Sequence, residues 1–407
     1  MIFNQQQREI IEGGVNHIKH GNEQVYQFGG KAGTGKTAVL HEMIRRIGVP
    51  LERVATMAFI GQAAIVMRTR GLWNAKTIHS WLYEPVLEPV LDEHGRQLKD
   101  PVYNTPVFNT VFIPRDLSDI DYFVIDEGRT VPASIKRDIE SRGKPIIVCG
   151  DQHQLPPVND EPAYIRDGDP NIHYLTQIMR QGKGSAILHI ADMVSQGIPL
   201  SAGLYDNVLV IEKKDLTDDM IRHAQIVICG TNKTRDYYNN YIRENILGYR
   251  THLPQYGEKV ICRKNNWNMT VAGISLANGL IGTVVTPPDV ATFNGKIFTM
   301  GFKPDLLGAY FPDLKCDYRY FTAPKEEREF IKNSKYFPGE KFEYAYCTTT
   351  HLCQGSQYPN GIYIQEFLSK DIQPNLDYTA ITRFEKFGIF VIPNRRSYYY
   401  TTTPFPR

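Results

Sequence analysis

One stretch of the chain, residues 29–37, most constrains what this sequence can fold into. It reads Gly-Gly-Lys-Ala-Gly-Thr-Gly-Lys-Thr, and the part from Gly30 to Thr37 fits the pattern G-x-x-x-x-G-K-[S/T]. An apolar run, residues 25–28, precedes it, and residues 38–47 follow with apolar side chains at helical spacing. The sequence therefore predicts a strand, a glycine-rich turn and a helix, which is the context of a phosphate-binding loop.

The residue types in this loop suit a phosphate group. Glycines let backbone N–H groups turn toward phosphate oxygens, and the N-terminus of the following helix adds its positive end. Lys36 is predicted to neutralise the β- and γ-phosphates of ATP, and the Thr37 hydroxyl to hold Mg²⁺. We expect the nucleotide to contact Gly30, Ala32, Gly33, Thr34, Gly35, Lys36 and Thr37.

Two further strands are predicted to end in catalytic side chains. Residues 121–127 form a buried strand that closes with Asp126 and Glu127. Asp126 is expected to bind Mg²⁺ through water, and Glu127 to orient and deprotonate the attacking water. Residues 145–149 form another strand, and the polar Gln154 that follows it is predicted to sense the γ-phosphate.

The composition is that of an ordinary soluble protein of several domains. Of 407 residues, 42% are hydrophobic and 22% are charged, and the net charge of +2 argues weakly against a static DNA coat. The six cysteines form no C-x-x-C pair, which favours reduced thiols over a zinc site or disulfides. No signal peptide or membrane-spanning run is found, so we expect a cytoplasmic protein without a membrane partner.

Two segments interrupt the α/β pattern. Residues 84–117 contain several prolines, and a turn signal within residues 90–98 predicts an inserted β-hairpin. A second α/β unit has strand candidates at residues 208–211, 226–229, 361–364 and 388–392. Within it, residues 257–341 are rich in Gly, Pro and aromatic residues and have short strand signals at 258–262, 277–285 and 296–300. These signals predict an inserted small β-barrel.

Taken together, these stretches resemble a superfamily 1 DNA helicase of the RecD/Dda-like branch. The resemblance covers most of the chain and depends on an ordered series of motifs. These are Gln7, residues 30–37, residues 61–64 (Gly-Gln-Ala-Ala), residues 77–80 (Thr-Ile-His-Ser), Asp126-Glu127, residues 150–158 (Gly-Asp-Gln-His-Gln-Leu-Pro-Pro-Val), residues 175–181 (Leu-Thr-Gln-Ile-Met-Arg-Gln), residues 349–358 (Thr-Thr-His-Leu-Cys-Gln-Gly-Ser-Gln-Tyr) and residues 378–383 (Tyr-Thr-Ala-Ile-Thr-Arg).

The resemblance implies an α/β fold with two RecA-like P-loop domains. Residues 1–83 and 118–170 would form the first, which holds the ATP site, and residues 171–256 and 342–407 the second. Residues 84–117 would be the inserted hairpin, and residues 257–341 the inserted barrel, of the SH3-like type.

The resemblance also implies an ATP-dependent DNA helicase that moves 5′-to-3′ on single-stranded DNA and separates duplex. Gln7 would read the adenine edge, Gly355 would contact the nucleotide, and Arg180 and Arg383 would be arginine fingers. The expected DNA contacts are Gly61, Gln62, Thr77, His79, Thr231, Asn232, Asn278, Thr350 and His351. The expected strand-separating pin is Glu93, His94, Gly95 and Arg96. Single-stranded and forked duplex DNA would be the partners, and protein partners stay open.

The motif series departs from its usual form at the presumed DNA track. Gln62 and Leu352 stand where a lysine is frequent, and each change removes a positive charge. Arg129 is expected to return one charge near the track. Two alternative functions stay open: a single-strand DNA clamp gated by ATP, and the motor subunit of a larger nuclease complex.

Overall fold

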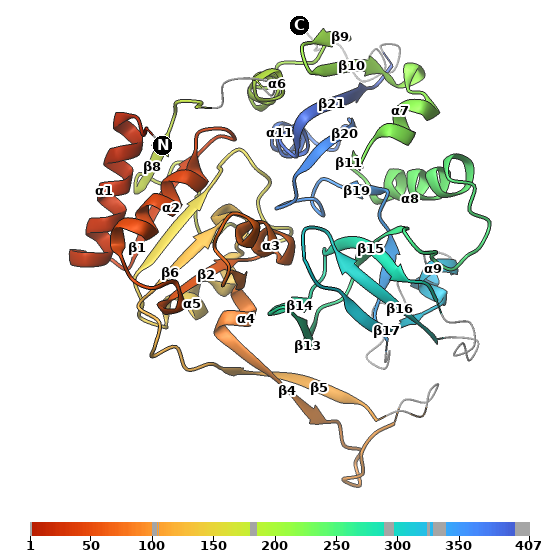
Figure 1. Cartoon of the computed structure of the whole chain (residues 1–407), viewed down its shortest axis with the longest axis horizontal. Coiled ribbons are helices and arrows are strands. Elements are labelled where there is room, and N and C mark those ends of the chain that lie inside the picture. Colours follow the sequence, from red (N-terminus) through yellow and green to blue (C-terminus); the bar gives the residue numbers. More distant parts are fainter. Residues whose placement is uncertain are drawn as a thin grey trace, which may run out of the picture. The chain divides into compact units, whose positions relative to one another are not determined.

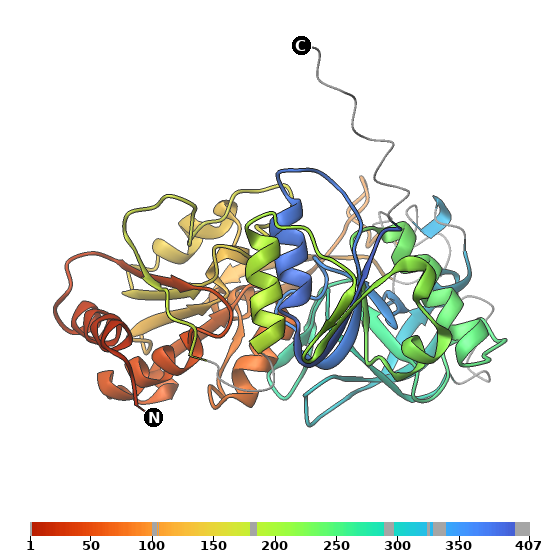
Figure 2. The same ribbon diagram turned by 90° about the horizontal axis from the view of Figure 1, so that it is seen from above.

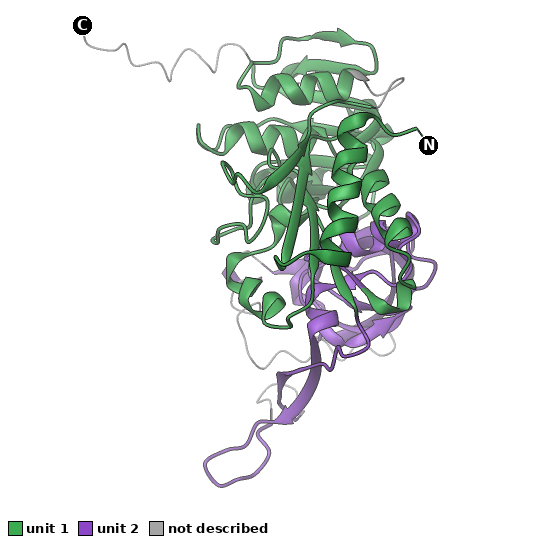
Figure 3. Cartoon of the chain, turned by 90° about the vertical axis from the view of Figure 1, so that its left-hand side faces the viewer, with its two compact units in different colours: residues 1–54, 121–249, 346–407 green, residues 55–120, 250–345 purple. Residues whose placement is uncertain are grey.

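The computed structural model describes residues 2–99, 104, 106–179, 185–288, 297–323, 326–328 and 339–394. The chain divides into two compact units, which Figure 3 colours separately. Unit 1 comprises residues 1–54, 121–249 and 346–407, and unit 2 comprises residues 55–120 and 250–345. Both predicted RecA-like domains thus fall mainly in unit 1, whereas residues 55–83 join the predicted hairpin and barrel in unit 2. The predicted domain boundaries stay a prediction.

The first sheet of unit 1 is built around β1 (Val25–Gly30). This strand runs parallel to β7 (Ile146–Gly150) on one side and to β8 (Ile172–Leu175) on the other, and β6 (Tyr122–Asp126) pairs in parallel with β7. Every residue of β7 is buried, as is typical of a parallel strand covered on both faces. The strands predicted at residues 25–28, 121–127 and 145–149 are confirmed. Because parallel strands end at the same edge, the loops after β1, β6 and β7 lie close together.

Helices α1 (Gln5–His20) and α2 (Lys36–Ile47) pack against each other beside this sheet, and α5 (Ala133–Glu140) follows β6 (Figure 1). The buried residues of α2 are Val39, Leu40, Met43, Ile44 and Ile47, at the spacing of one helical face. Gly48 ends α2 in the left-handed conformation, with φ of 78°. The predicted helix at residues 38–47 is confirmed.

The second sheet of unit 1 has the order β19-β11-β20-β21-β10-β9 and is parallel except at β9. Its strands are β9 (Gly203–Tyr205), β10 (Val208–Glu212), β11 (Val227–Cys229), β19 (Cys347–Thr349), β20 (Tyr358–Ile364) and β21 (Phe384–Ile392). The strands predicted from residues 208, 226, 361 and 388 are confirmed.

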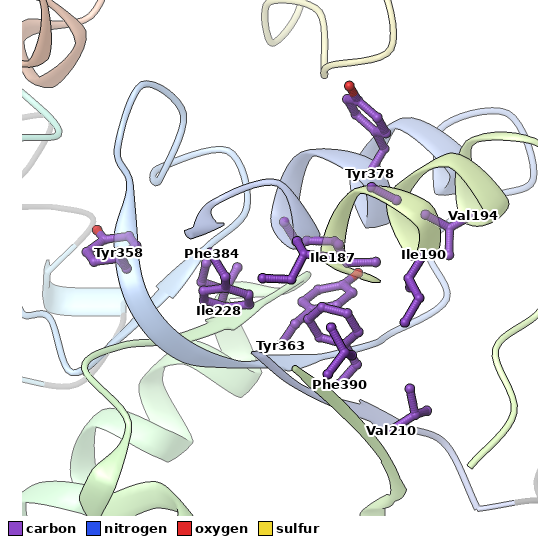
Figure 4. Close-up of a cluster of buried hydrophobic side chains, with 14 of the residues drawn as sticks. Ile187, Ile190, Val194, Val210, Ile228, Tyr358, Tyr363, Tyr378, Phe384 and Phe390 are labelled. Atoms are coloured by element: carbon purple, nitrogen blue, oxygen red, sulfur yellow. The ribbon is translucent and has the colours of Figure 1, made fainter. Parts of the chain in front are cut away.

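Helices cover both faces of the second sheet. On one face, α6 (Ser185–Ser195) and α11 (Gln373–Ile381) lie side by side, as Figure 2 shows. They bury a cluster with Ile228, Tyr363 and Phe390 (Figure 4). On the other face, α7 (Asp218–His223) and α8 (Asn232–Tyr241) pack on a second cluster. Alternate residues of β10, β11, β20 and β21 enter the two clusters, which explains why these strands read as continuous apolar runs.

Unit 2 contains the end of the first α/β segment and the larger insertion. Strand β2 (Val54–Ala58) leads the chain into it, pairs in parallel with β3 (Lys76–Thr77), and is followed by α3 (Gly61–Thr69); α4 (Ile78–Leu82) follows β3. An antiparallel five-stranded sheet has the order β17-β16-β15-β12-β18. Its strands are β12 (Lys259–Cys262), β15 (Ile281–Thr286), β16 (Ile297–Pro304), β17 (Phe311–Asp317) and β18 (Phe342–Tyr344). The hairpin β13 (Asn266–Val271) with β14 (Ile274–Leu276) and the short helix α9 (Arg319–Thr322) complete it.

The predicted barrel corresponds to this antiparallel sheet. A bridge between Cys316 of β17 and Glu340 connects one edge strand to the residues just before the other, β18. Assignment of the sheet to the SH3-like type stays a prediction.

The predicted hairpin is longer than its turn signal indicates. Strands β4 (Tyr83–Pro89) and β5 (Phe108–Pro114) pair along their whole lengths, and Figure 1 shows them as a projecting ribbon. The turn at residues 92–96 belongs to a smaller hairpin beyond them, closed by the pair Leu91 and Gln97. The prolines conceal β4 and β5 in the sequence, because proline is tolerated only where a strand edge needs no N–H donor.

Within the described residues, no helix combines the length and apolar character needed to cross a bilayer.

Candidate nucleotide site and DNA track

The loop between β1 and α2 is shaped by its glycines. Gly33 and Gly35 have φ values of 82° and 88°, which side chains rarely adopt. At Gly30, an added Cβ would lie 2.6 Å from Thr34 Oγ1 and 2.9 Å from the Leu175 carbonyl oxygen. The loop is therefore a tight turn without room for a side chain at Gly30. Backbone N–H groups can then face its interior and bind an anion.

Lys36, at the start of α2, points back over this loop. Its Nζ donates to the carbonyl oxygens of Gly30 (2.6 Å) and Lys31 (3.1 Å), and lies 3.7 Å from Asp151 Oδ2. Thr37 is the next residue of α2. The lysine charge is thus held at the loop mouth, where phosphate oxygens could replace the carbonyl groups.

The end of β6 holds the predicted acid pair. Asp126 Oδ1 accepts from the Glu127 N–H (2.8 Å) and from the Cys149 thiol (3.0 Å), so one carboxylate oxygen is fixed within the sheet edge. Glu127 has φ of 54° and ψ of 41°, a left-handed conformation that costs about 1–3 kcal/mol for a residue with a side chain. Such strain is common where a catalytic side chain must be aimed.

The environment of Glu127 suits a proton acceptor. Burial, and then the neighbouring Asp126 charge, raise the pKa of Glu127, while Arg383 and Lys36 act in the opposite direction. A carboxylate with a raised pKa accepts a proton from water more readily near neutral pH. The interactions of Glu127 with Lys36 and Arg383 also place residues from the P-loop and from the end of α11 around one acid.

The loop after β7 contributes Asp151 and Gln154. Asp151 is fully buried and accepts from the Tyr378 hydroxyl (2.6 Å) and the His153 N–H (3.0 Å). Gln154 is buried, and its Oε1 has no hydrogen-bond partner among the described residues. A buried amide oxygen without a donor is costly, and a bound water would satisfy it.

Helix α11 is joined to the loop after β7 by hydrogen bonds from three side chains. The Leu155 N–H donates to Thr379 Oγ1 (2.9 Å), Asn375 Nδ2 donates to the His153 carbonyl oxygen (3.0 Å), and Tyr378 binds Asp151. Gln354 Nε2 also donates to the Leu155 carbonyl oxygen (2.9 Å). The predicted sensor loop is therefore attached to the second sheet.

Arg383 follows α11 and is buried. Its guanidinium donates to the carbonyl oxygens of Thr379 (2.9 Å) and Ser356 (3.3 Å), and the latter residue is adjacent to Gly355, which has φ of 76°. The other predicted finger, Arg180, lies outside the described residues. The finger roles stay predictions.

Gln7 is buried beside the P-loop. Its Nε2 donates to the Thr34 carbonyl oxygen (3.1 Å), and its Oε1 accepts from the Asn4 N–H (3.1 Å) as part of a capping box at the start of α1. A cavity of about 740 Å³ opens nearby and is lined by Phe3, Thr37, Ala38, His41, Glu42, Arg45 and Arg46. Its volume is within the range of small-molecule sites. The glycine loop and this cavity together fit a nucleoside triphosphate.

The predicted DNA contacts of unit 1 gather at the ends of β11 and β19. Thr231 caps α8 and donates its hydroxyl to Glu366 (3.0 Å), and Asn232 is exposed beside it. Thr350 is fully buried and donates to the Cys229 carbonyl oxygen (3.2 Å). His351 is half-buried, and burial lowers its pKa.

The predicted DNA contacts of unit 2 lie on α3, at the start of α4 and at a turn of the antiparallel sheet. An added Cβ at Gly61 would lie 3.2 Å from atoms of both Ala277 and Leu280, which flank the exposed Asn278. Gln62 is buried, with Oε1 unpartnered among the described residues. Thr77 caps α4, on which His79 lies. The contacts to DNA stay predictions.

The predicted pin residues form an exposed turn. Asp92 Oδ1 accepts from the N–H groups of His94 (2.9 Å) and Arg96 (3.0 Å), and Gly95 has φ of 75°. Glu93, His94 and Arg96 are exposed. The turn is therefore locally ordered, and its role as a pin stays a prediction.

The expectation for Arg129 is wrong. This side chain is buried, pairs with Asp167 (2.9 Å) and donates to the carbonyl oxygens of Gln154 (2.8 Å) and Ile165 (3.0 Å). Asp167 neutralises its charge, and the side chain fixes the loop after β7 through the Gln154 carbonyl group. A buried cation requires such partners, so it returns no charge to the DNA track.

Three side chains beside the predicted site residues, Tyr378, Cys149 and Trp267, were not predicted from the sequence to contact them. Tyr378 and Cys149 touch the acids of the nucleotide site, and Trp267 stacks on His79. For Tyr378 the available signal was its place within the motif at residues 378–383. For Trp267 it was a large aromatic residue between two asparagines.

The fold and the site define a P-loop protein with two RecA-like parallel sheets. The sequence matches the family described as AAA domain over residues 3–213, which is more than half of the chain, and the chain belongs to that family.

Solved structures of Pif1 helicases share the fold over nearly the whole chain. A structure of Pif1 helicases described for unwinding at forked double-stranded DNA is 16% identical, covers 98% of this chain and 96% of that chain, and has a TM-score of 0.55. The structure of Pif1 from Bacteroides with ADP-AlF3 and single-stranded DNA is 16% identical, covers 98% of this chain and 96% of that chain, and has a TM-score of 0.53. The structure of Pif1 from Candida albicans is 16% identical, covers 98% of this chain and 95% of that chain, and has a TM-score of 0.52. The resemblance to superfamily 1 helicases is thus confirmed for the fold.

Proposed function

We propose that this protein is an ATP-dependent DNA helicase that moves 5′-to-3′ on single-stranded DNA and separates duplex. The observation that carries the proposal is the gathering of parts around Glu127. The P-loop lysine, the sensor loop and Arg383, which follows a helix of the second sheet, all lie around this acid. A P-loop enzyme that acts on a small molecule has no need for a second parallel sheet joined to its sensor loop.

Hydrolysis follows from the roles of these side chains. Lys36 would leave the Gly30 and Lys31 carbonyl groups to neutralise phosphate charge, and Gln154 Oε1 would accept a hydrogen bond from the attacking water. Glu127 would take the proton of that water. Arg383 would stabilise the charge that develops on the transferred phosphoryl group.

Mg²⁺ fits the donors present at this site. Thr37 would supply a hydroxyl, and Asp126 a carboxylate whose Oδ1 is already fixed by Glu127 and Cys149. When bound, the ion would offset the charge of the β- and γ-phosphates.

Movement on DNA would depend on the hydrogen bonds between α11 and the loop after β7, which carries the predicted sensor Gln154. Because Tyr378, Thr379 and Asn375 bind the loop that carries Gln154, a change at the phosphate position alters the contacts of α11. The predicted DNA contacts Thr231, Asn232, Thr350 and His351 lie on the same second sheet. The Pif1 structures with single-stranded and forked DNA support DNA as the substrate.

The test compares 5′-tailed and 3′-tailed duplexes in an unwinding assay with ATP and Mg²⁺, beside ATPase measured with and without single-stranded DNA. We expect unwinding only of the 5′-tailed duplex and ATPase that DNA stimulates. Unwinding of the 3′-tailed duplex alone would overturn the polarity. DNA-stimulated ATPase without unwinding or translocation would indicate a clamp. Translocation without unwinding would favour a motor that needs a partner, such as a nuclease.

A further inference from the structure

The segment that follows β8, residues 176–179, lies against the P-loop without regular secondary structure of its own. We call it the strap. All four of its residues are exposed, so apolar burial does not hold it in place. Its last residue nevertheless binds the P-loop, because the Met179 N–H donates to the Gly33 carbonyl oxygen at 2.9 Å. Polar contacts must therefore fix the strap.

The first turn of α1 supplies these polar contacts. Gln6 Nε2 donates to the Tyr174 carbonyl oxygen (2.6 Å), and Gln6 Oε1 accepts from the Thr176 N–H (3.0 Å). One side-chain amide thus pairs with the backbone on both sides of the end of β8. Asn4 Nδ2 donates to Gln177 Oε1 at 2.8 Å. Two side chains of one helical turn therefore hold the beginning of the strap.

The same turn also reaches the P-loop directly. Asn4 Oδ1 accepts from the Gln7 N–H (2.8 Å), and Gln7 Nε2 donates to the Thr34 carbonyl oxygen (3.1 Å). Two successive carbonyl groups of the P-loop, those of Gly33 and Thr34, are thus held by donors from outside the loop. One donor belongs to the strap and the other to α1.

These outside donors set the direction of backbone N–H groups in the loop. In a trans peptide the C=O of one residue and the N–H of the next point in opposite directions. Holding the Gly33 and Thr34 carbonyl groups outward therefore turns the N–H groups of Thr34 and Gly35 to the other side. The Thr34 N–H does point across the loop, toward the Lys31 carbonyl oxygen at 3.3 Å. N–H groups turned this way are those that cradle phosphate oxygens.

We propose that Asn4 and Gln6 are positioning residues for the P-loop. They hold the strap, and the strap and Gln7 orient the N–H groups of the loop toward phosphate oxygens. This inference rests on the nucleotide site of the proposed function, and it assigns roles to two residues outside the motif series. Because the oriented groups face phosphate, the effect concerns the phosphates of the nucleotide and not its base.

The competing explanation is that Asn4 and Gln6 only stabilise α1. Gln6→Met separates the two, because methionine has a similar length and removes both hydrogen bonds to the backbone near β8. Dissociation constants are measured for a fluorescent ADP analogue, and by competition for ADP and adenosine. The affinity for ADP should fall about two- to tenfold, as expected when one or two hydrogen bonds are lost, and the affinity for adenosine should stay unchanged.

Gln5→Met is the matched control for Gln6→Met. Gln5 lies in the same turn and is exposed, and its amide donates only to Glu9 of the same helix, at 2.9 Å. The affinities of Gln5→Met for ADP and adenosine should equal those of the wild type. A loss of ADP affinity that both variants share would show that any change in this turn has the same effect, and would overturn the proposal.

A double-mutant cycle tests the contact of Asn4 with Gln177. Asn4→Asp keeps the helix cap, since aspartate caps as well as asparagine. In Asn4→Asp and in Gln177→Glu, one partner still has a donor to face the other's acceptor. The double variant places two carboxylates together. Its loss of ADP affinity should exceed the product of the two single losses by about threefold or more. Independent effects would exclude this role for Asn4.

Two further results would overturn the proposal. These are an unchanged affinity for ADP in Gln6→Met, and an equal loss of affinity for ADP and adenosine. Circular dichroism and thermal melting identify loss of folding, and the cycle then decides, because its single variants keep the cap. A wild-type chain that does not bind ADP would contradict the nucleotide site and this inference together. A wild-type chain that hydrolyses ATP without moving on DNA would contradict the proposed function alone.

Discussion

The hydroxyl of Tyr378 donates to Asp151 across 2.6 Å, and both residues are buried. The same hydroxyl accepts a hydrogen bond from the Ala32 N–H of the P-loop at 2.7 Å. In Figure 4 the Tyr378 ring lies at the margin of the cluster, with its hydroxyl directed away from Tyr363 and Phe390. One side chain of α11 therefore links the phosphate-binding loop to the sensor loop, and a phosphate group would compete with it for the Ala32 N–H.

Tyr378→Phe should strengthen nucleotide binding while weakening the fold. Removing the competing hydrogen bond should raise the affinity for ADP about two- to tenfold. Loss of the Tyr378 donor to the buried Asp151 carboxylate should cost about 1–3 kcal/mol in the free energy of unfolding, even though the His153 N–H bond remains. Titration with a fluorescent ADP analogue and urea denaturation measure the two effects.

Tyr363→Phe is the matched control for Tyr378→Phe. Tyr363 is also fully buried and donates to a buried carboxylate, that of Asp377, at 2.5 Å. It should show a similar loss of stability without a change in nucleotide affinity. An unchanged affinity in Tyr378→Phe would mean that the hydroxyl does not compete with phosphate.

Lys36→Ala and Glu127→Gln should separate binding from chemistry. Without Lys36 the phosphate charge is not neutralised, so nucleotide binding should weaken and ATPase should be lost. Glu127→Gln should bind nucleotide as the wild type does but lose turnover, because an amide accepts no proton from water. Nucleotide binding and phosphate release are measured on both, and full turnover in Glu127→Gln would remove Glu127 from the role of base.

The raised pKa of Glu127 predicts a pH-dependent stability difference. Its pKa in the folded chain lies above the ordinary value of 4.5, so its ionisation costs the folded state stability. The cost is absent below pH 4.5 and grows as pH rises through the folded-state pKa. Glu127→Gln should therefore unfold at higher urea than wild type at pH 7.5, and this advantage should shrink toward pH 4.5. An equal advantage at every pH would contradict the shift.

Arg383→Lys should reduce DNA-stimulated ATPase by roughly a thousandfold, as expected for an arginine finger. Lysine keeps the charge but lacks the planar fork that also holds the Thr379 and Ser356 carbonyl groups. Arg235→Lys is the control, since Arg235 is equally buried and pairs with Asp236 on α8. Turnover near the wild-type rate in Arg383→Lys would exclude the finger role.

Shortening the tip of the hairpin should separate unwinding from translocation. Replacing residues 91–98 by a two-residue turn removes the small hairpin around Gly95 and leaves the pairing of β4 with β5 in place. ATPase stimulated by single-stranded DNA and streptavidin displacement from a 3′-biotinylated strand should persist, and unwinding of a 5′-tailed duplex should fall sharply. If all activities persist, the pin lies elsewhere; if all are lost, the tip has a structural or DNA-gripping role.

The sequence by itself determined the local elements of the candidate nucleotide site. The P-loop, the strand ending in Asp126 and Glu127, and the strand before Gln154 were each predictable, because each is a local pattern of apolar runs, glycines and polar ends. Parallel strands then bring their ends to one edge, which required no knowledge of the packing. The strands of the second sheet were predictable for the same reason, since both faces are covered and the runs are continuously apolar.

Only the tertiary structure decided how these parts are joined. Tyr378 and Asp151 are separated by 227 residues, and no local pattern predicts that one hydroxyl bridges them. Arg129 carries a charge that suggested DNA, yet burial against Asp167 gives it a structural role. The sequence predicted a hairpin within residues 84–117, but its prolines obscured the extents of β4 and β5. Prolines are tolerated there because each strand of a two-stranded ribbon has an edge that needs no hydrogen-bond donor. The stack of Trp267 on His79 likewise depends on contact between distant segments, whose energy is set by packing and not by local preference.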